Sequence, residues 1–440
     1  MLVSNIPSYF RTRRERLMKA NPSAVFIFPA NAHPLRNPDV TYGYRQESNF
    51  HYLTGFEEPD SILVLTPSLS KPGTHKMVLF VLRRDLDKEM WNGERYGTDR
   101  ARMVFGADEA YTQDEFDKRL PELLAGADQV FYRLGKDAAF DRRVLSGLEM
   151  FRSAQGRTGR GILAIKDPAE VLGEMRLFKS EEEVELLRKA CVATALAHKM
   201  AMKEVRPGMN EYEVEALIDY AFRKNGCQRI GYGTIVAGGK NATCLHYVAN
   251  NEPLKDGDLL LIDAGGEYNY YTSDITRTFP VGKSFTDAQA QAYELVLKSQ
   301  KEAIAMAKPG VTIAGIHQHV CDVLTEGFIS LGLMTGKRED ILKSTGYTRF
   351  YPHRTSHYLG MDVHDVGLYL ANGEPRKLEP GMVFTIEPGF YVQPSDTAVP
   401  AGYQNIGIRI EDDILITPTG CENLTISCPK ERNELEALRG

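Results

Sequence analysis

The feature that most constrains the fold of this chain is an internal repeat in its second part. A Pro-Gly turn between two helix-like segments occurs at residues 206–210 and again at residues 308–312. A turn–strand unit also recurs: residues 254–263 read LKDGDLLLID and residues 378–387 read LEPGMVFTIE. Two unrelated turn–strand units are the alternative, but both copies end in an acid, and acids are disfavoured in buried strands. The repeat predicts an α+β domain of two halves folded face to face, with a strand-borne carboxylate from each near a common axis.

The first part of the chain has a different pattern. Compact apolar runs at residues 23–28, 61–65 and 77–82 are bounded by turn-forming residues, as buried strands are. They alternate with helical stretches such as residues 112–124. This alternation is typical of an α/β layer domain.

The boundary between the two parts is expected just before a long helix. Ser180 and Glu183 form a capping-box pattern, which predicts an amphipathic helix running to about residue 205. We therefore expect an N-terminal domain over residues 1–174 and a C-terminal domain over residues 175–440.

Composition argues against several classes of function. With 53 basic and 59 acidic residues the formal charge is −6, whereas a nucleic-acid-binding protein usually has a basic face. No apolar run approaches the ~18 residues of a membrane helix, and the charged N-terminus does not resemble a signal peptide. The six cysteines lack CxxC spacing and are expected to be buried thiols in a reducing compartment. We expect a cytoplasmic protein that binds neither nucleic acid nor membranes.

Two aspartates in the first half of the repeat point to a metal site. Asp263 closes an apolar strand, and Asp274 follows a hairpin connection of Gly, Tyr and Asn residues. If the turn centres on Tyr268-Asn269, the two aspartates oppose each other with Cβ atoms about 5 Å apart. Two such carboxylates in an apolar setting repel each other unless a cation lies between them. Oxygen ligands suit Mn²⁺, Mg²⁺ or Ca²⁺, with Zn²⁺ or Co²⁺ possible if imidazole joins.

The second half of the repeat offers further ligands. Glu387 ends the repeated strand, and the alternation over residues 406–411 places Arg409 and Glu411 on one face. His357 is a candidate imidazole ligand, because three histidines crowd into this region, at positions 353, 357 and 364.

Together these residues resemble the "pita-bread" metallopeptidases. Asp263, Asp274, His357, Glu387 and Glu411 stand in the order and contexts of that family's five metal ligands: IDAG, SDITRTF, SHYLGMDVHD, TIEPGFY and GIRIEDD. The family includes methionine aminopeptidase, prolidase, aminopeptidase P and the metal-free creatinase. Residues 44–56, YRQESNFHYLTGF, resemble the first domain of bacterial aminopeptidase P, which removes an N-terminal residue that precedes proline.

The resemblance implies two divalent ions, usually manganese in this branch, that share a water or hydroxide. It places Asp263 on one ion, His357 and Glu387 on the other, and Asp274 and Glu411 on both. Glu387 is then positioned to accept the proton of the shared water.

Further roles are carried over from the same family. His246 corresponds to the histidine that contacts the scissile carbonyl or shuttles protons, and His364 to one that binds substrate and stabilises the intermediate. His353 also has a counterpart near the substrate, and Arg409 could orient Glu411 or meet the product carboxyl side. Substrate contacts are implied for Tyr391, near the proline ring, and for two residues of the first domain, Trp91 and Asp39. Asp39 would act across a subunit boundary, in a homo-oligomer such as a dimer or tetramer. Simple packing is the alternative for Tyr391 and Trp91.

Two other functions stay open at this point. Prolidase shares all five ligands but acts on dipeptides, and a tripeptide assay would distinguish it. A non-catalytic pita-bread binding module would typically lose ligands and gain charged tails, whereas here the ligands are complete and the last residues, 430–440, are mixed in charge.

Overall fold

The computed structural model describes residues 6–70, 73–157 and 161–439. The chain divides into two compact units, one up to Leu172 and one from Gly173. The division falls inside helix α7 (Ala169–Leu177), as does the predicted boundary at 174/175. Within the described ranges, no helix combines the length and apolar character needed to cross a membrane.

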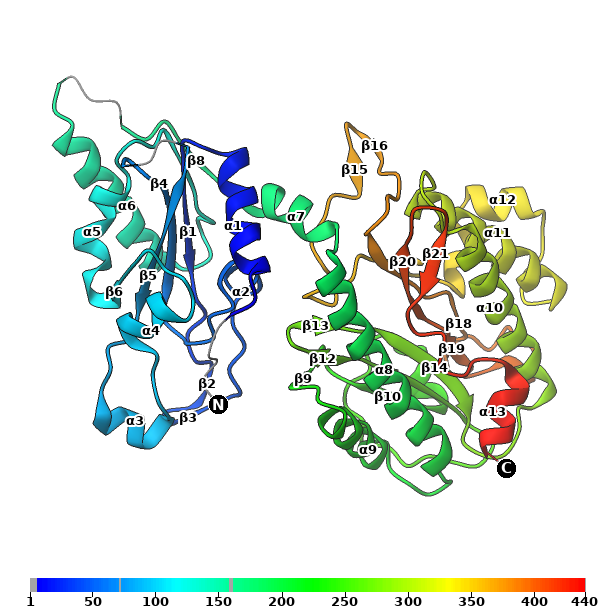
Figure 1. The fold of residues 1–440 in the computed structure, drawn as a ribbon. Coiled ribbons are helices and arrows are strands. Elements are labelled where there is room, and N and C mark those ends of the chain that lie inside the picture. The colour runs from blue at the N-terminus through cyan, green and yellow to red at the C-terminus, as the bar shows by residue number, and fades with distance from the viewer. Residues whose placement is uncertain (1–5, 71–72, 158–160, 440) are drawn as a thin grey trace. The chain divides into compact units, whose positions relative to one another are not determined.

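The first unit is built on a six-stranded mixed sheet with strand order β6-β5-β4-β1-β7-β8 (Figure 1). These strands are β1 (Ala24–Pro29), β4 (Ile62–Pro67), β5 (His75–Val81), β6 (Glu109–Thr112), β7 (Gln129–Phe131) and β8 (Ala164–Lys166). The three predicted apolar runs form β1, β4 and β5. Around the sheet lie α1 (Tyr9–Ala20), α2 (Ser48–Thr54), α3 (Leu86–Asn92), α4 (Gly97–Met103), α5 (Phe116–Leu123), α6 (Ala138–Ala154) and the ribbon β2 (Leu35–Asn37)–β3 (Val40–Thr41).

One core of this unit lies on one face of the sheet, between the strands and two helices. Phe116 and Leu120 of α5 and Phe140 of α6 pack against Val25 and Val64 of the central strands. This is the predicted α/β layer arrangement, and it confirms the fold class of the first domain.

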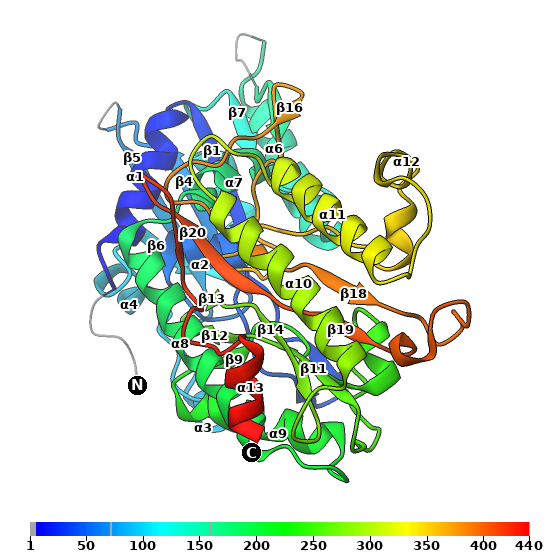
Figure 2. The same cartoon turned by 90° about the vertical axis from the view of Figure 1, so that its right-hand side faces the viewer.

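The second unit has two pairs of long helices over short antiparallel sheets (Figure 2). The helices are α8 (Glu181–Glu204), α9 (Glu211–Lys224), α10 (Asp287–Met306) and α11 (Ile313–Ser330), with the shorter α12 (Arg338–Lys343) and α13 (Arg432–Arg439). Helix α8 begins at the predicted capping box: Ser180 Oγ accepts from Glu183 N, and Glu183 Oε2 accepts from Ser180 N at 3.0 Å.

The strands of this unit fall into small groups. One three-stranded sheet is β10 (Ile235–Gly238)–β11 (Leu259–Ala264)–β14 (Ile275–Pro280), and its counterpart is β17 (Val383–Ile386)–β20 (Asp412–Ile416)–β21 (Cys421–Asn423). The others are β13 (Tyr271–Thr272)–β12 (Gly266–Tyr268)–β9 (Arg229–Ile230), β18 (Gly389–Tyr391)–β19 (Gly407–Arg409) and β15 (Leu370–Ala371)–β16 (Glu374–Pro375).

The internal repeat is visible in equivalent hydrogen bonds. Gly208 N donates to Leu254 O at 2.8 Å in the first half, and Gly310 N donates to Leu378 O at 2.9 Å in the second. The two turn glycines have nearly the same positive φ, +92° and +90°, which favours glycine at both places. The predicted duplicated α+β architecture is therefore confirmed.

The predicted register of the first carboxylate hairpin is wrong by two residues. Asp263 pairs with Thr276 rather than with Asp274, because the two-residue turn consists of Asn269 and Tyr270 instead of Tyr268 and Asn269. Both turn residues have positive φ, 46° and 70°, as a hairpin turn that matches strand twist requires. A shift of two residues preserves the face of a strand, so both aspartates still point to the same side.

The cysteine prediction needs one correction. All six are free, but Cys244 is exposed and Cys421 is half-buried; only the other four are buried. Cys244 lies just beyond the short 3-10 helix Gly239–Thr243, a connection that leaves its side chain outside the core.

Candidate metal centre

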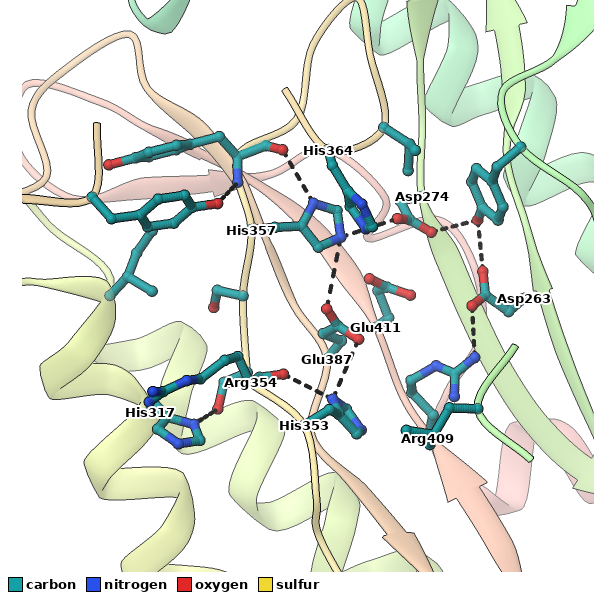
Figure 3. Close-up of a pocket in the computed structure, with 18 of the residues that line it drawn as sticks. Asp263, Asp274, His317, His353, Arg354, His357, His364, Glu387, Arg409 and Glu411 are labelled. Atoms are coloured by element: carbon teal, nitrogen blue, oxygen red, sulfur yellow. Dashed lines mark hydrogen bonds and ion pairs between the residues drawn. The ribbon is translucent and has the colours of Figure 1, made fainter. Parts of the chain in front are cut away.

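The second unit contains a cavity of about 860 Å³ whose wall brings the two halves of the repeat together. All five candidate ligands line it (Figure 3). Four of the residues with implied substrate or proton-transfer roles line it as well. The former are Asp263, Asp274, His357, Glu387 and Glu411, and the latter are His246, His353, His364 and Arg409.

Asp263 and Asp274 are joined by a tyrosine that the sequence did not single out. The hydroxyl of Tyr232 lies 2.7 Å from Asp263 Oδ1 and also contacts Asp274 Oδ1. A phenol has one proton to donate, so the Tyr232 hydroxyl cannot fully satisfy two carboxylates that lie this close together. Burial and the charge of Asp263 raise the pKa of Asp274 above its usual value.

His357 and Glu387 meet because an irregular segment pairs with β17. The backbone of residues 355–359 runs antiparallel to that strand; for example, Glu387 N donates to Thr355 O at 2.9 Å. This register puts the side chains of His357 and Glu387 on one face. His357 Nε2 lies 3.7 Å from Glu387 Oε1 and 3.4 Å from Asp274 Oδ2.

Glu411 is placed by contacts between the two halves. Its backbone N–H donates to Thr276 O at 3.1 Å, and Thr276 Oγ1 donates to Glu411 Oε2 at 2.6 Å. Asp274, His357 and Glu411 each offer a ligand atom within 4.8 Å of the others, close enough for one cation to contact all three.

The electrostatics of the cavity also fit a cation. Burial and the charges of Asp274 and Glu387 raise the pKa of Glu411 well above its usual value. Burial raises the pKa of Glu387 to about 7, although His357 and Arg409 oppose the shift. Such carboxylates become ionised ligands when a positive ion replaces the lost hydration, so the donor set suits a hard or borderline divalent metal.

Asp263 and His357 differ from these acids because each has a charged neighbour. Burial by itself would raise the pKa of Asp263, but Arg409, whose Nη2 donates to Asp263 Oδ2 at 2.6 Å, lowers it. Burial would likewise lower the pKa of His357, but Asp274 and Glu387 raise it to about 9. His357 Nδ1 donates to the Tyr358 carbonyl at 3.1 Å, which leaves Nε2 facing the carboxylates.

His353 is held by a tyrosine and an arginine. Its Nδ1 donates to the Arg354 carbonyl at 2.8 Å, and Tyr391 Oη lies 2.9 Å from Nε2. Arg409 Nη1 in turn donates to Tyr391 Oη at 3.0 Å. Burial and the Arg409 charge lower the pKa of His353 to about 3, so its ring is neutral and Nε2 accepts from Tyr391.

This arrangement changes the role expected of Tyr391. Its ring is 1% exposed and is not among the residues that line the cavity. Tyr391 therefore supports His353 and Arg409, which line the cavity, and its implied contact with a proline ring stays a prediction.

His364 lies on a loop that is anchored from behind. Its ring meets that of His357 edge to face, with centroids 4.4 Å apart. The next residue, Asp365, is buried, and its carboxylate accepts from Arg176 Nη2 at 2.5 Å and from Lys179 Nζ at 3.1 Å. The loop that carries His364 is thus tied to the start of the second unit.

Trp91 and Asp39 belong to the first unit and are not among the residues that line the cavity. Trp91 is 85% exposed on α3, so packing within its own unit does not explain it. Asp39 is exposed in the turn of the β2–β3 ribbon. Their implied substrate contacts remain predictions.

Four residues of the site were missed at the level of sequence: Tyr232, His317, Arg354 and Asp365. The available signal for Tyr232 was its position between two glycines, which indicates close packing of the backbone. In the structure a Cβ on Gly231 would lie 1.9 Å from Thr272 Oγ1. His317 belongs to an ordinary amphipathic helix, α11, and nothing in its sequence context distinguishes it from a core residue.

Comparison with known proteins agrees with this picture. Residues 185–418 match the model of metallopeptidase family M24, and residues 10–132 match the aminopeptidase P N-terminal domain. The chain is 43% identical to the Xaa-Pro aminopeptidase of Escherichia coli over 98% of its own length and 97% of that protein. Proline aminopeptidase P II from Yersinia pestis has a similar structure, with a TM-score of 0.94 and 42% identity over 99% of both chains. Zn-substituted E. coli aminopeptidase P in complex with product gives 0.95 at the same identity and coverage.

Fold, cavity and donor set thus define a two-domain metallopeptidase that works with divalent metal. The chain belongs to metallopeptidase family M24 and carries the N-terminal domain of aminopeptidase P.

Proposed function

We propose that this protein is an Xaa-Pro aminopeptidase, which hydrolyses the peptide bond between an N-terminal residue and a penultimate proline. The observation that carries the proposal is the convergence of five candidate metal ligands from both halves of the repeat on one cavity. The similarity to Xaa-Pro aminopeptidases along nearly the whole chain supports the specificity.

Two divalent ions would be held by the five candidate ligands. Asp263 would bind one ion, His357 and Glu387 the other, and Asp274 and Glu411 both, in agreement with the closeness of Asp274 and Glu411 to His357. When bound, such ions supply a water of lowered pKa and stabilise the charge of the tetrahedral transition state.

The remaining work falls to side chains of the chain itself. Glu387, which lines the cavity beside His357, would accept a proton from the attacking water. His246 and His364 face the same cavity and would move a proton to the leaving group and hold the substrate carbonyl. The surrounding carboxylates would bind the substrate ammonium group, which explains why a free N-terminus should be required.

The test is cleavage of Arg-Pro-Pro, Arg-Ala-Pro and acetyl-Arg-Pro-Pro in the presence of manganese, with the dipeptide Arg-Pro as a fourth substrate. We expect release of arginine from Arg-Pro-Pro alone. Comparable rates on the three tripeptides would refute the specificity, preference for the dipeptide would indicate prolidase, and no cleavage of any would count against the hydrolase itself.

Several finer points belong to the same proposal. We expect manganese as the metal, with Zn²⁺, Co²⁺ or Mg²⁺ as substitutes, to be checked by elemental analysis of the purified protein. We also propose a homo-oligomer, a dimer or tetramer, in which Trp91 and Asp39 of the first domain contact substrate. The protein would act in the cytoplasm on proline-containing peptides, without nucleic-acid or membrane partners.

A further inference from the structure

The cavity wall carries a positive charge that the hydrolytic site does not use. Three arginines line the cavity, and two of them have carboxylate partners: Arg409 pairs with Asp263 at 2.6 Å, and Arg376 pairs with Glu174 at 3.0 Å. Arg354 is exposed, and across the described parts of the chain no hydrogen bond or ion pair involves its guanidinium. An unpaired arginine on a cavity wall is suited to bind an anion supplied by a ligand.

The position of Arg354 relative to the ligands is set by its neighbours. Its carbonyl accepts from His353 Nδ1, which also lies 3.7 Å from Glu387 Oε2. The next residue, Thr355, is buried, and its hydroxyl contacts His317 Nδ1 at 2.8 Å and Tyr351 Oη at 2.7 Å. These contacts fix the backbone on both sides of Arg354 while its own side chain stays in the open part of the cavity.

The two sides of the site differ in charge and in accessibility. In Figure 3, Asp263 and Arg409 lie on one side, Glu387 and Glu411 in the middle, and Arg354 beside His317 on the other side. The first side is closed, since Arg409 is 4% exposed and bonded to Asp263. The side of His353 and Arg354 is open, so a peptide whose ammonium group lies at the carboxylates can extend past His353 towards Arg354.

We propose that Arg354 binds a carboxylate on the C-terminal side of the proline and so makes short anionic peptides preferred substrates. The inference rests on the proposed Xaa-Pro aminopeptidase activity and names its substrate class. Two carboxylates have the required chemistry: the C-terminus of a tripeptide, or an acidic side chain immediately after proline. The planar guanidinium can donate two parallel hydrogen bonds to either.

The experiment compares kcat/KM for four peptides at neutral pH. Arg-Pro-Ala is set against Arg-Pro-Ala-amide to test the terminal carboxylate, and Arg-Pro-Asp-amide against Arg-Pro-Asn-amide to test the side chain. We expect the anionic member of at least one pair to be preferred about tenfold, mainly through KM. Arg354→Met should bring that ratio to about one. Arg354→Lys should retain only part of the preference, because lysine keeps the positive charge but lacks the forked geometry of the guanidinium.

The control is Arg338→Met, which removes an exposed arginine of α12 that does not line the cavity and should leave the ratios at their wild-type values. Ratios near one in the wild type, or an unchanged preference in Arg354→Met, would overturn the inference while the aminopeptidase activity stands. Cleavage of none of the four peptides would remove the proposed function and this inference together.

Discussion

Two buried acids that are adjacent in the second unit, Asp412 and Glu411, differ in how far their charge is compensated by neighbouring residues. Asp412 accepts hydrogen bonds from Arg277 Nη2 at 2.7 Å and from Gln300 Nε2 at 2.8 Å, and it also contacts Lys430 Nζ. Burial alone would raise its pKa, but the charges of Arg277 and Lys430 hold the pKa of Asp412 far below its usual value. The adjacent Glu411 faces the cavity. Its carboxylate accepts from the Thr276 hydroxyl and is surrounded by other acids.

This difference in charge compensation distinguishes acids that stabilise the fold from acids that can bind a metal ion. An acid surrounded by donors and cations is satisfied within the chain and holds elements in place, as Asp412 and Asp365 do. An acid whose buried charge meets only partial compensation is poised for a cation from outside. Residues adjacent in sequence, Glu411 just before β20 and Asp412 at its start, can therefore have unlike roles, and each can be tested separately.

The largest effect is expected from Asp274→Ala and Glu411→Ala. Both variants should lose metal and at least roughly 10⁴-fold in kcat, because the activated water and the transition-state charge stabilisation disappear together. Metal content is measured by elemental analysis at matched free metal, with Glu326→Ala, an exposed change on α11, as the control. Wild-type metal stoichiometry in either variant would remove these residues from the ligand set.

His246→Ala should cost roughly 10²- to 10⁴-fold in kcat while metal content stays at the wild-type value, because a proton-transfer residue contributes to the reaction and not to binding of the ions. Steady-state kinetics and elemental analysis of one preparation check both points. Loss of metal in this variant would make His246 a ligand.

Asp412→Ala should destabilise the protein by about 3–5 kcal/mol, because the buried Arg277 and the half-buried Lys430 would lose their shared counter-charge. Glu411→Gln in the metal-free protein should leave stability unchanged or raise it, since it removes a repelling acid. Denaturant unfolding of both variants compares the two regions directly. Equal destabilisation would mean that both acids serve the fold.

Asp365→Asn should lower kcat/KM about 10- to 100-fold, the usual effect of losing a group that orients an active-site residue. The amide keeps a hydrogen-bond acceptor for Arg176 but loses the charge, so the loop that carries His364 is held less firmly. The readout is the split between kcat and KM at unchanged metal content. An effect on thermal stability alone would limit Asp365 to a structural role.

Glu58, in the first unit, is a buried acid that does not line the candidate metal site, and within the described parts of the chain no ion pair involves its carboxylate. It is 9% exposed, and burial raises its pKa to about 7 even though Tyr96 N donates to it at 2.5 Å. Between its ordinary pKa and about 7, Glu58 keeps a proton in the folded state that it releases in the unfolded state. The contribution of Glu58 to stability is therefore fully present below its ordinary pKa and is lost as pH rises through about 7.

Glu58→Gln should therefore abolish about 2 kcal/mol of pH-dependent stability between pH 5 and pH 8. Thermal unfolding of the full-length protein at both pH values measures it, with the exposed Glu122→Gln as control. A pH slope identical to the wild type would show that Glu58 is ionised in the folded state.

Much of the site follows from patterns that are local in sequence. The repeated turn–strand–acid unit locates Asp263 and Glu387, alternation places Arg409 and Glu411 on one face, and the Ser180 cap locates the start of α8. Each of these signals depends on residues within one strand or one helical turn, where backbone geometry restricts what the side chains can do.

What lies between distant segments was decided by the tertiary structure. The register of the Asp263 hairpin depends on which residues adopt a positive φ. The amino-acid sequence was compatible both with a turn at Tyr268-Asn269 and with the observed turn at Asn269-Tyr270. The meeting of His357 with Glu387, the link from Arg409 through Tyr391 to His353, and the open position of Arg354 all arise from strand pairings across many residues. Charge compensation is likewise three-dimensional: Glu411 and Asp412 are neighbours in sequence, and only the cations packed around one of them make it structural.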